Sequence, residues 1–255
     1  MIIIFVFIIG LSIGSFINVL VYRLKNKQNI VSGRSKCPNC KKKLGLLELI
    51  PIISFFIQGG KCTSCKEKIS WQYPLVEISS GILFLIIYLE ILPKTFEEWT
   101  VVVGYIFFSI FLITIFTYDL KYYLIPDVIV IPGIILAILY SLINYHITIW
   151  QSLLGAAIAG GFFLFLVLIS QEKWMGWGDV KLGLFIGALL GWPLILLGLF
   201  MSFVLGAVVG IGLIIFKKKK MKSALPFGTF LTFSTISVLL WGDKALNWYL
   251  NIIGY

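Results

Sequence analysis

The chain has 255 residues, 60% of them hydrophobic, and a mean hydropathy of +1.02. This composition excludes an ordinary soluble domain and indicates an integral membrane protein surrounded by membrane lipids. The net charge of +10 does not indicate nucleic acid as a partner, because the basic residues fall between apolar spans rather than on one amphipathic face.

The first predicted element is an apolar helix at residues 2–22. It has neither a positively charged segment at its start nor a clear cleavage site made of small residues. We therefore expect a retained membrane span with its N-terminus outside the cell, rather than a removed signal peptide.

The segment that follows, residues 23–73, contains all four cysteines, as CPNC and CTSC. Cys37, Cys40, Cys62 and Cys65 form two pairs with 21 residues between them, a spacing typical of a closed, tetrahedral structural zinc site. Two disulfides or free thiols are the alternatives, but a reducing cytoplasm disfavours disulfides and the neighbouring lysines favour thiolates. A four-cysteine site leaves no position for water, so we expect the zinc to fold the loop rather than to catalyse a reaction.

Within this loop, residues 44–60 are apolar but too short to cross a bilayer comfortably. The segment also contains Glu48 and Pro51, so we place it in a loop or on the membrane interface.

Seven further apolar segments follow and bring the expected number of transmembrane helices to about eight. They lie at residues 74–92, 99–118, 127–145, 151–170, 180–192, 194–216 and 226–243. Only Gly191, Trp192 and Pro193 separate two of them, so one long kinked helix over 180–216 is the alternative.

The distribution of basic residues tests this topology. Eight spans with an outer N-terminus place 19 of the 21 Lys and Arg residues in the cytoplasm, 11 of them in residues 23–73, as the positive-inside rule requires. Fusing the two uncertain spans would move the lysine-rich run at 217–222 outside, so the charges favour the break. We expect an all-α polytopic membrane protein divided into a first helix at 1–22, a cytoplasmic zinc loop at 23–73 and a membrane domain at 74–255.

Two of the four aspartates fit structural roles in this topology. Asp127 follows Pro126 at the start of a helix, where a carboxylate meets free amides and the positive end of the dipole. Asp243 lies beside Lys244 at the outer face. We expect Asp127 to turn the chain and to start the next helix.

The other two aspartates, Asp119 and Asp179, are the candidate catalytic pair. Asp119 ends a span at the inner face, where a carboxylate opposes the helix dipole. Asp179 begins a span at the same depth, beside Gly176 and Gly178, which allow close approach of a peptide, and two residues before Lys181. Two such carboxylates brought together share one proton, so that one activates water and the other protonates the peptide, as in aspartic proteases.

Other catalytic sets are excluded by the residues that the chain lacks on the inner face. His146 is the only histidine and lies in an outer loop, so a histidine-based triad or zinc protease centre is not available there. A proton-coupled transporter, a presenilin-like intramembrane protease and a zinc-dependent adaptor without catalysis stay as alternatives. The aspartates lie at span ends rather than mid-span, which disfavours the transporter.

The motifs resemble the type IV prepilin peptidases, the aspartic peptidases of bacterial membranes. The similar stretches are GSFINVLVYRL (14–24), CPNC, LELIPIISFF, CTSC, ISWQYPLVE (69–77), YDLKYYLIPD, GWGDVKL and LPFGTFL (225–231). Together they cover nearly the whole chain. One departure is Lys121, where many members have an acidic residue two positions after the first aspartate.

The resemblance implies an enzyme of the bacterial cytoplasmic membrane with its active site facing the cytoplasm. It implies removal of the basic leader of prepilins or pseudopilins, with a cut after a glycine just before a hydrophobic helix and with Asp119 and Asp179 as the catalytic pair. It also implies methylation of the new N-terminal amine by S-adenosylmethionine. Because such leaders are basic, Glu48, Glu67 and Glu77 are candidate contacts for the substrate.

Overall fold

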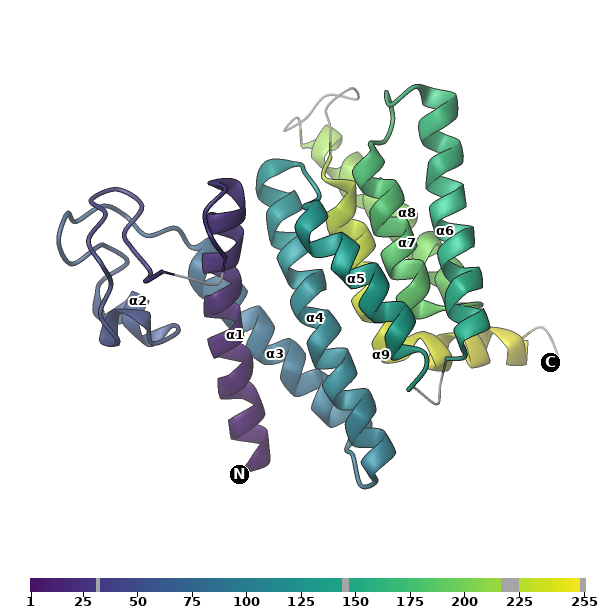
Figure 1. The fold of residues 1–255 in the computed structure, drawn as a ribbon, viewed down its shortest axis with the longest axis horizontal. Coiled ribbons are helices and arrows are strands. Elements are labelled where there is room, and N and C mark those ends of the chain that lie inside the picture. The colour runs from purple at the N-terminus through teal and green to yellow at the C-terminus, as the bar shows by residue number, and fades with distance from the viewer. Residues whose placement is uncertain (31–32, 144–146, 217–224, 253–255) are drawn as a thin grey trace. The chain divides into compact units, whose positions relative to one another are not determined.

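The computed structural model describes residues 1–30, 33–143, 147–216 and 225–252 (Figure 1). The lysine-rich run at 217–222 and His146 lie outside the described residues. The chain divides into two compact units, Met1–Glu98 and Trp99–Tyr255. The predicted division at residues 22 and 73 stays a prediction.

The first unit is built on two long helices with the cysteine loop between them. The unit contains α1 (Ile2–Lys25), η1 (Leu47–Leu49), α2 (Ile53–Ile57) and α3 (Gln72–Ile91). Glycines let α1 and α3 approach closely, as in small-residue helix interfaces of membranes. A Cβ built on Gly10 lies 2.7 Å from the Cα of Gly81, and one built on Gly14 lies 2.6 Å from the Cα of Glu77. This contact fixes where Glu77 lies along α1.

The second unit is a bundle of helices around α7. Its helices are α4 (Phe96–Tyr122, which begins in the last residues of the first unit), α5 (Asp127–Tyr140), α6 (Ile149–Ser170), α7 (Trp177–Leu190), α8 (Leu194–Ile215) and α9 (Phe227–Ile252). Helix α7 packs against α5, α6, α8 and α9. The predicted break is confirmed, since α7 ends at Leu190 and α8 begins at Leu194.

Every predicted span corresponds to a helix, although several boundaries differ: α4 extends from Phe96 to Tyr122, α5 ends at Tyr140, and α9 is longer than predicted. Helix α9 continues through Asp243 to Ile252, because polar residues end an apolar run without ending a helix. Five helices of the described chain are long and apolar enough to cross a membrane, namely α1, α3, α4, α6 and α8. These helices confirm an all-α, multi-pass membrane fold, while the count of eight spans stays a prediction.

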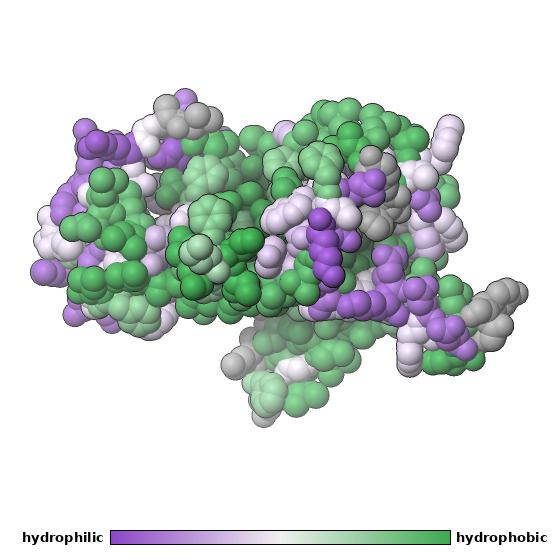
Figure 2. All heavy atoms as spheres, turned by 90° about the horizontal axis from the view of Figure 1, so that it is seen from below, coloured by the Kyte–Doolittle hydropathy of each residue, from purple (hydrophilic) through white to green (hydrophobic). Residues whose placement is uncertain are grey.

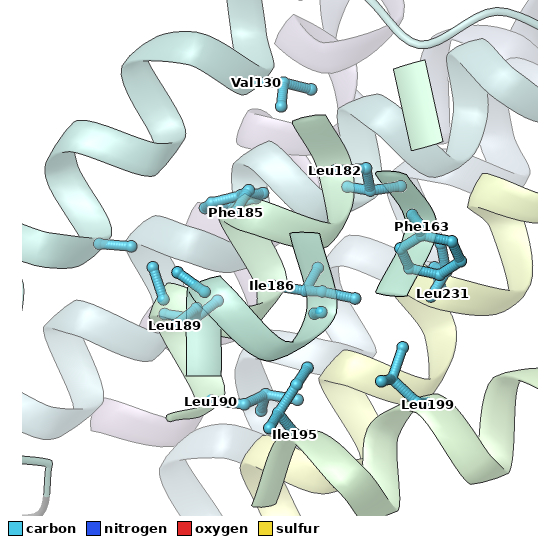
Figure 3. Packing of buried hydrophobic residues seen from close by; sticks show 14 of the residues in the cluster. Val130, Phe163, Leu182, Phe185, Ile186, Leu189, Leu190, Ile195, Leu199 and Leu231 are labelled. Atoms are coloured by element: carbon cyan, nitrogen blue, oxygen red, sulfur yellow. The ribbon is translucent and has the colours of Figure 1, made fainter. Parts of the chain in front are cut away.

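The core of the second unit surrounds α7 (Figure 3). Phe185, Ile186 and Leu190 of α7 are fully buried against side chains from neighbouring helices, including Phe163 and Ile195. By contrast, large apolar side chains cover much of the outer surface (Figure 2). An exposed apolar surface of this extent fits helices that face lipid.

Helices α6 and α7 are packed backbone against backbone. A Cβ built on Gly155 lies 2.3 Å from the carbonyl oxygen of Gly187, and one built on Gly187 lies 2.3 Å from that of Gly155. Ser152 reinforces the contact, because its hydroxyl donates to the carbonyl of Ala188 at 2.8 Å. The pair of glycines therefore sets the position of α7, whose first turn carries Asp179.

Substituting Gly155 tests this packing. We expect Gly155→Val to lower the free energy of unfolding by at least about 2 kcal/mol, since overpacking a filled interface typically costs about 1–3 kcal/mol. Gly161→Val is the matched control, because a Cβ at Gly161 of the same helix meets nothing within 4 Å. Thermal unfolding of the detergent-solubilised protein measures the difference, and equal stability of the two variants would contradict the close contact.

Candidate functional site

Asp119 lies in the last turn of α4 and is buried, with 4% of its surface exposed. Its Oδ2 atom accepts a hydrogen bond from the backbone N–H of Thr229 at 2.9 Å. Thr229 belongs to the first turn of α9, where helix amides lack partners of their own and the dipole favours an anion. The start of α9 thus compensates for the unfavourable position of Asp119 at the end of α4.

Gly228 and Thr229 adjoin the Asp119 carboxylate, and sequence reasoning did not single them out. A Cβ built on Gly228 lies 2.9 Å from Asp119 Oδ2, so only glycine leaves room for the carboxylate there. The hydroxyl of Thr229 donates to the carbonyl of Pro226 at 2.7 Å and therefore does not compete with the amide. The available signal was the stretch LPFGTFL, in which a proline at a helix start precedes free amides.

Asp179 is the third residue of α7 and is partly buried. Its Oδ2 atom accepts from the backbone N–H of Gly176 at 3.0 Å, the arrangement of a helix cap. A glycine at position 178 is needed for space, because a Cβ built on it lies 3.1 Å from the Cβ of Ile125. Its backbone conformation is one that other residues also adopt. Asp179 therefore caps α7, and Gly178 before it packs against Ile125 in the segment that follows Asp119.

Ile125 lies between the elements that carry the two aspartates. A Cβ built on Gly178, the residue before Asp179, lies 3.1 Å from the Cβ of Ile125, and one built on Gly228 lies 3.4 Å from its Cδ1 atom. Gly228 in turn adjoins Asp119, and the charge of Asp179 acts on the Asp119 carboxyl. Asp119 and Asp179 are therefore near enough for their charges to interact, and their action as a catalytic pair stays a prediction.

Asp127 forms an ion pair with a lysine instead of lying beside another carboxylate. It is the first residue of α5, as predicted, and its carboxylate pairs with the ammonium of Lys181 at 2.7 Å. Both side chains are partly exposed, so the pair contributes little to stability. It does link the starts of α5 and α7 on either side of Ile125.

An apolar cavity of about 410 Å³ adjoins the aspartate site. Thr229, whose amide holds Asp119, belongs to its wall. The other lining residues come from α4 and the residue after it, from α8, and from the start of α9 with the two residues before it: Phe116, Leu120, Tyr123, Leu205, Val209, Leu213, Leu225, Pro226, Phe230 and Phe233. An apolar peptide segment lying there would place its end beside Asp119.

In the first unit, the four cysteines form a cluster suited to zinc. Their Sγ atoms all lie within 4.8 Å of one another, and those of Cys37 and Cys65 are 3.8 Å apart. A tetrahedron with Zn–S bonds of about 2.3 Å has S–S edges of about 3.8 Å, so the sulfurs fit this ion. The backbone amides of Cys65 and Ser64 lower the pKa of the Cys62 thiol to about 6, whereas desolvation and the neighbouring thiols raise the pKa of the Cys40 thiol to about 11.

The two cysteine turns repeat one local structure. The amide of Cys37 donates to the carbonyl of Lys42, and the amide of Cys62 donates to that of Glu67, both at 2.9 Å. The residue after the second cysteine of each turn has a φ of 60°. A repeated turn that points two thiols at one centre is what a four-cysteine zinc site requires.

Glu48 ties the two cysteine turns together. Its carboxylate accepts from the Lys42 ammonium at 3.0 Å, from the Gly45 amide at 2.8 Å and from the Thr63 hydroxyl. These donors, the Thr63 hydroxyl first, lower the pKa of Glu48 to about 2. Glu48 is therefore engaged within the loop, whereas Glu67 is exposed and Glu77 is buried.

Comparison with known proteins matches both units. Residues 8–91 match the "Bacterial Peptidase A24 N-terminal domain" and residues 106–211 match the "Type IV leader peptidase family". The first match contains the cysteine cluster, and the second contains Asp119 and Asp179 but ends before Gly228 and Thr229.

Curated relatives resemble the chain over nearly its whole length. The "Prepilin leader peptidase/N-methyltransferase" of Bacillus subtilis (strain 168) is 32% identical, over 96% of this chain and 97% of the relative. The protein of the same name from Aeromonas salmonicida (strain A449) is 30% identical, over 97% and 94%, and that from Pseudomonas aeruginosa is 29% identical, over 97% and 93%. No solved structure matches the chain.

Replacing the cysteines tests the metal assignment. We expect replacement of all four by serine to abolish bound zinc and to lower the unfolding temperature, because the loop loses the ion that organises its small core. Elemental analysis of the purified protein measures zinc per chain. Ser64→Ala, in the same turn as Cys62, is the control and should retain the metal. Unchanged zinc in the quadruple variant would refute the assignment.

Proposed function

The chain belongs to the type IV leader peptidase family, and on that basis we propose that it cleaves the basic leader from type IV prepilins or pseudopilins. Asp119 and Asp179 are its catalytic residues. The observation that carries this proposal is that a buried carboxylate, held by the start of α9, lies near enough to a second carboxylate from α7 for the two charges to interact. A transporter or a presenilin-like protease would not need the matching cysteine unit.

The chemistry follows from two carboxyl groups in one partly dry site. They share a proton, so that the ionised group removes a proton from water as the water attacks the scissile carbonyl. The protonated group donates its proton to the carbonyl oxygen and later supports protonation of the leaving amine. Because the two carboxyl groups interact, their pKa values describe the loss of protons from the pair and cannot be assigned to one residue.

Neighbouring residues position this pair. The Thr229 amide fixes one oxygen of Asp119, and the Gly176 amide fixes one oxygen of Asp179. Gly178 and Gly228 keep side-chain atoms out of the space around Ile125. The ion pair between Lys181 and Asp127 holds the starts of α7 and α5 together.

The apolar cavity beside Asp119 supports a cut next to a hydrophobic helix. Apolar side chains dominate its wall, and Thr229 connects it with the aspartate. The hydrophobic segment after the scissile bond lies in this cavity, and the polar leader extends towards the aqueous side. This arrangement places the scissile bond at the membrane edge, where water can reach the aspartates.

A second activity is methylation of the amine that cleavage releases. The names of the relatives include N-methyltransferase, and S-adenosylmethionine is the methyl donor that such an activity uses. The enzyme lies in the bacterial cytoplasmic membrane with the N-terminus outside and both the cysteine loop and the aspartates on the cytoplasmic side. The distribution of Lys and Arg supports this orientation.

Asparagine substitutions test the catalytic pair. With a purified prepilin-like substrate, we expect Asp119→Asn and Asp179→Asn each to lower the cleavage rate by at least about 1,000-fold, since general acid–base groups contribute about 10²–10⁴-fold. Asp127→Asn is the control and should keep the rate within about threefold. Gel-resolved cleavage over time gives the rates. Full cleavage by either Asp119→Asn or Asp179→Asn would remove that residue from the mechanism.

Gly228→Ala tests the positioning of Asp119. Its new methyl group would press on Asp119 Oδ2, and a displacement of about 1 Å in an active site can cost about 100-fold in rate. We expect kcat to fall at least tenfold with KM little changed. Gly212→Ala, where a Cβ meets nothing within 4 Å, is the control. Equal kcat values in the two variants would contradict the contact.

A further inference from the structure

We infer that an apolar segment of the cysteine loop, residues 46–57, enters one leaflet of the membrane, and that lysines around it contact anionic lipid headgroups. Sequence reasoning left two placements for this stretch, a loop or the membrane interface, and the contacts of the segment favour the interface. The leaflet is the cytoplasmic one in the orientation proposed above. The inference concerns the first unit alone and does not depend on the peptidase activity.

The apolar segment exposes large side chains, although it lies outside the long helices. Helix α2 buries one ring, that of Phe55, whose centroid lies 4.9 Å from that of Trp71. The next residue, Phe56, points away from this contact and is 61% exposed. The other exposed apolar side chains of the segment are Leu46, Leu47, Ile50, Ile53 and Ile57. Water hydrates such a surface unfavourably, whereas the acyl region of a bilayer accepts it.

Contacts within the first unit place the apolar segment beside the membrane-spanning part of its helices. The Ile52 amide donates to Oε2 of Glu77 at 2.7 Å. Glu77 is the sixth residue of α3, and a Cβ built on Gly14, at the middle of α1, lies 2.6 Å from the Cα of Glu77. At a rise of about 1.5 Å per residue, Gly14 lies about 16 Å from the end of α1 at Lys25. The turn at Ile52 therefore lies at a depth where α1 and α3 are apolar.

The backbone of the apolar segment is suited to a setting with little water. Backbone that enters the hydrocarbon region needs hydrogen-bond partners from the protein. Glu77 provides one for Ile52, while the amide of Ser54 donates to the carbonyl of Ile50 at 3.0 Å and that of Phe56 to the carbonyl of Ile52 at 3.2 Å. Ile52 also has a φ of 63°, which is unfavourable for a β-branched residue and persists where contacts enforce it. The bond to Glu77 thus fixes the turn beside α3.

Basic residues accompany this apolar surface. Residues 23–73 contain eleven Lys and Arg residues but only two acidic residues, Glu48 and Glu67. All eleven except Arg23 are exposed, and Glu48 is already paired with Lys42. Hydrophobic surface lies next to hydrophilic surface on the loop, at the left of Figure 2. Apolar side chains combined with lysines are typical of segments that lie on anionic membranes, because the lysines are attracted to the headgroups.

Lipid fits this surface better than a protein partner does. The two helices that hold the loop, α1 and α3, are each long and apolar enough to cross a membrane, so lipid already surrounds the ends of the loop. Phe16 of α1 lines one groove with Leu49 and Pro51 of the apolar segment, which makes the exposed surface of α1 continuous with the segment. Trp71, just before α3, is 62% exposed, and tryptophan is enriched at membrane interfaces. The segment thereby holds the cysteine cluster at the membrane surface.

Photocrosslinking in a bilayer tests the depth of the apolar segment. The full-length protein, with p-benzoylphenylalanine in place of Phe56, is reconstituted in nanodiscs of phosphatidylethanolamine and phosphatidylglycerol. We expect illumination to attach phospholipid to the peptide that contains position 56, with a yield at least about tenfold above that for the same probe at Lys43. Lys43 is the matched control, because it is exposed in the same loop but outside the apolar segment. Zinc retained by both preparations shows that the loop is folded.

The composition of the lipid adducts tests the role of the lysines. We expect the ratio of phosphatidylglycerol to phosphatidylethanolamine adducts at position 56 to exceed the ratio in the nanodisc at least twofold. Replacing lysines of the loop by glutamine should return it to the ratio in the nanodisc; the replaced residues are Lys41, Lys43, Lys61, Lys66 and Lys68. Lys94→Gln is the control, because Lys94 is exposed beyond the other end of α3, and it should keep the enrichment.

Three outcomes would overturn the inference. A probe at position 56 that crosslinks to a second copy of the chain or to a prepilin-like substrate, and not to lipid, would make the surface a protein interface. Equal lipid yields at positions 56 and 43 would contradict the placement of the apolar segment in the leaflet. Adducts of the unmodified loop in the same lipid ratio as the nanodisc would remove the lysines from headgroup binding.

Discussion

The structure of the second unit depends on the burial of the Asp119 carboxylate among apolar helices. Transferring a charge out of water costs several kcal/mol, and one hydrogen bond to a charged group returns about 1.5–3 kcal/mol. The amides of Thr229 and Gly228 each provide such a bond, and a proton shared with Asp179 suits what remains of the cost. The start of α9 is therefore fixed in space by a residue 110 positions earlier in the chain.

The remaining helices bring the second carboxylate to the same place. Gly155 and Gly187 allow the backbones of α6 and α7 to touch. This contact fixes the position of α7 along α6, and with it the position of the first turn of α7. Asp179 lies in that turn and caps it. Ile125 lies between Gly178, which precedes Asp179, and Gly228, which adjoins Asp119. Ordinary close packing in the core thus determines the geometry of a site at its edge.

Local patterns predict much of this arrangement from sequence. Apolar runs predict the helices, the charges predict the break at Trp192, and paired cysteines predict the cluster that the structure contains. The depth of Asp119 and Asp179 follows from the spans as well. The hydrogen bond between Asp119 and the Thr229 amide is not predictable from sequence. Every residue except proline has a backbone amide, so the donor has no side-chain pattern, and the two residues lie 110 positions apart. The pairing of Lys181 with Asp127, rather than with nearby Asp179, is also a tertiary outcome.

The two units share one physical pattern for handling a buried carboxylate. Glu77 and Asp119 each lie buried among apolar helices, and each accepts a hydrogen bond from a backbone amide distant in sequence. Each carboxylate also has a second donor, the Ser15 hydroxyl for Glu77 and the Gly228 amide for Asp119. A Cβ built on Gly14 would meet the Cα of Glu77, whereas one built on Gly228 would meet the carboxylate of Asp119 itself. Hydrogen bonds offset part of the cost of burying a carboxylate, and for Asp119 a proton shared with Asp179 suits the remainder.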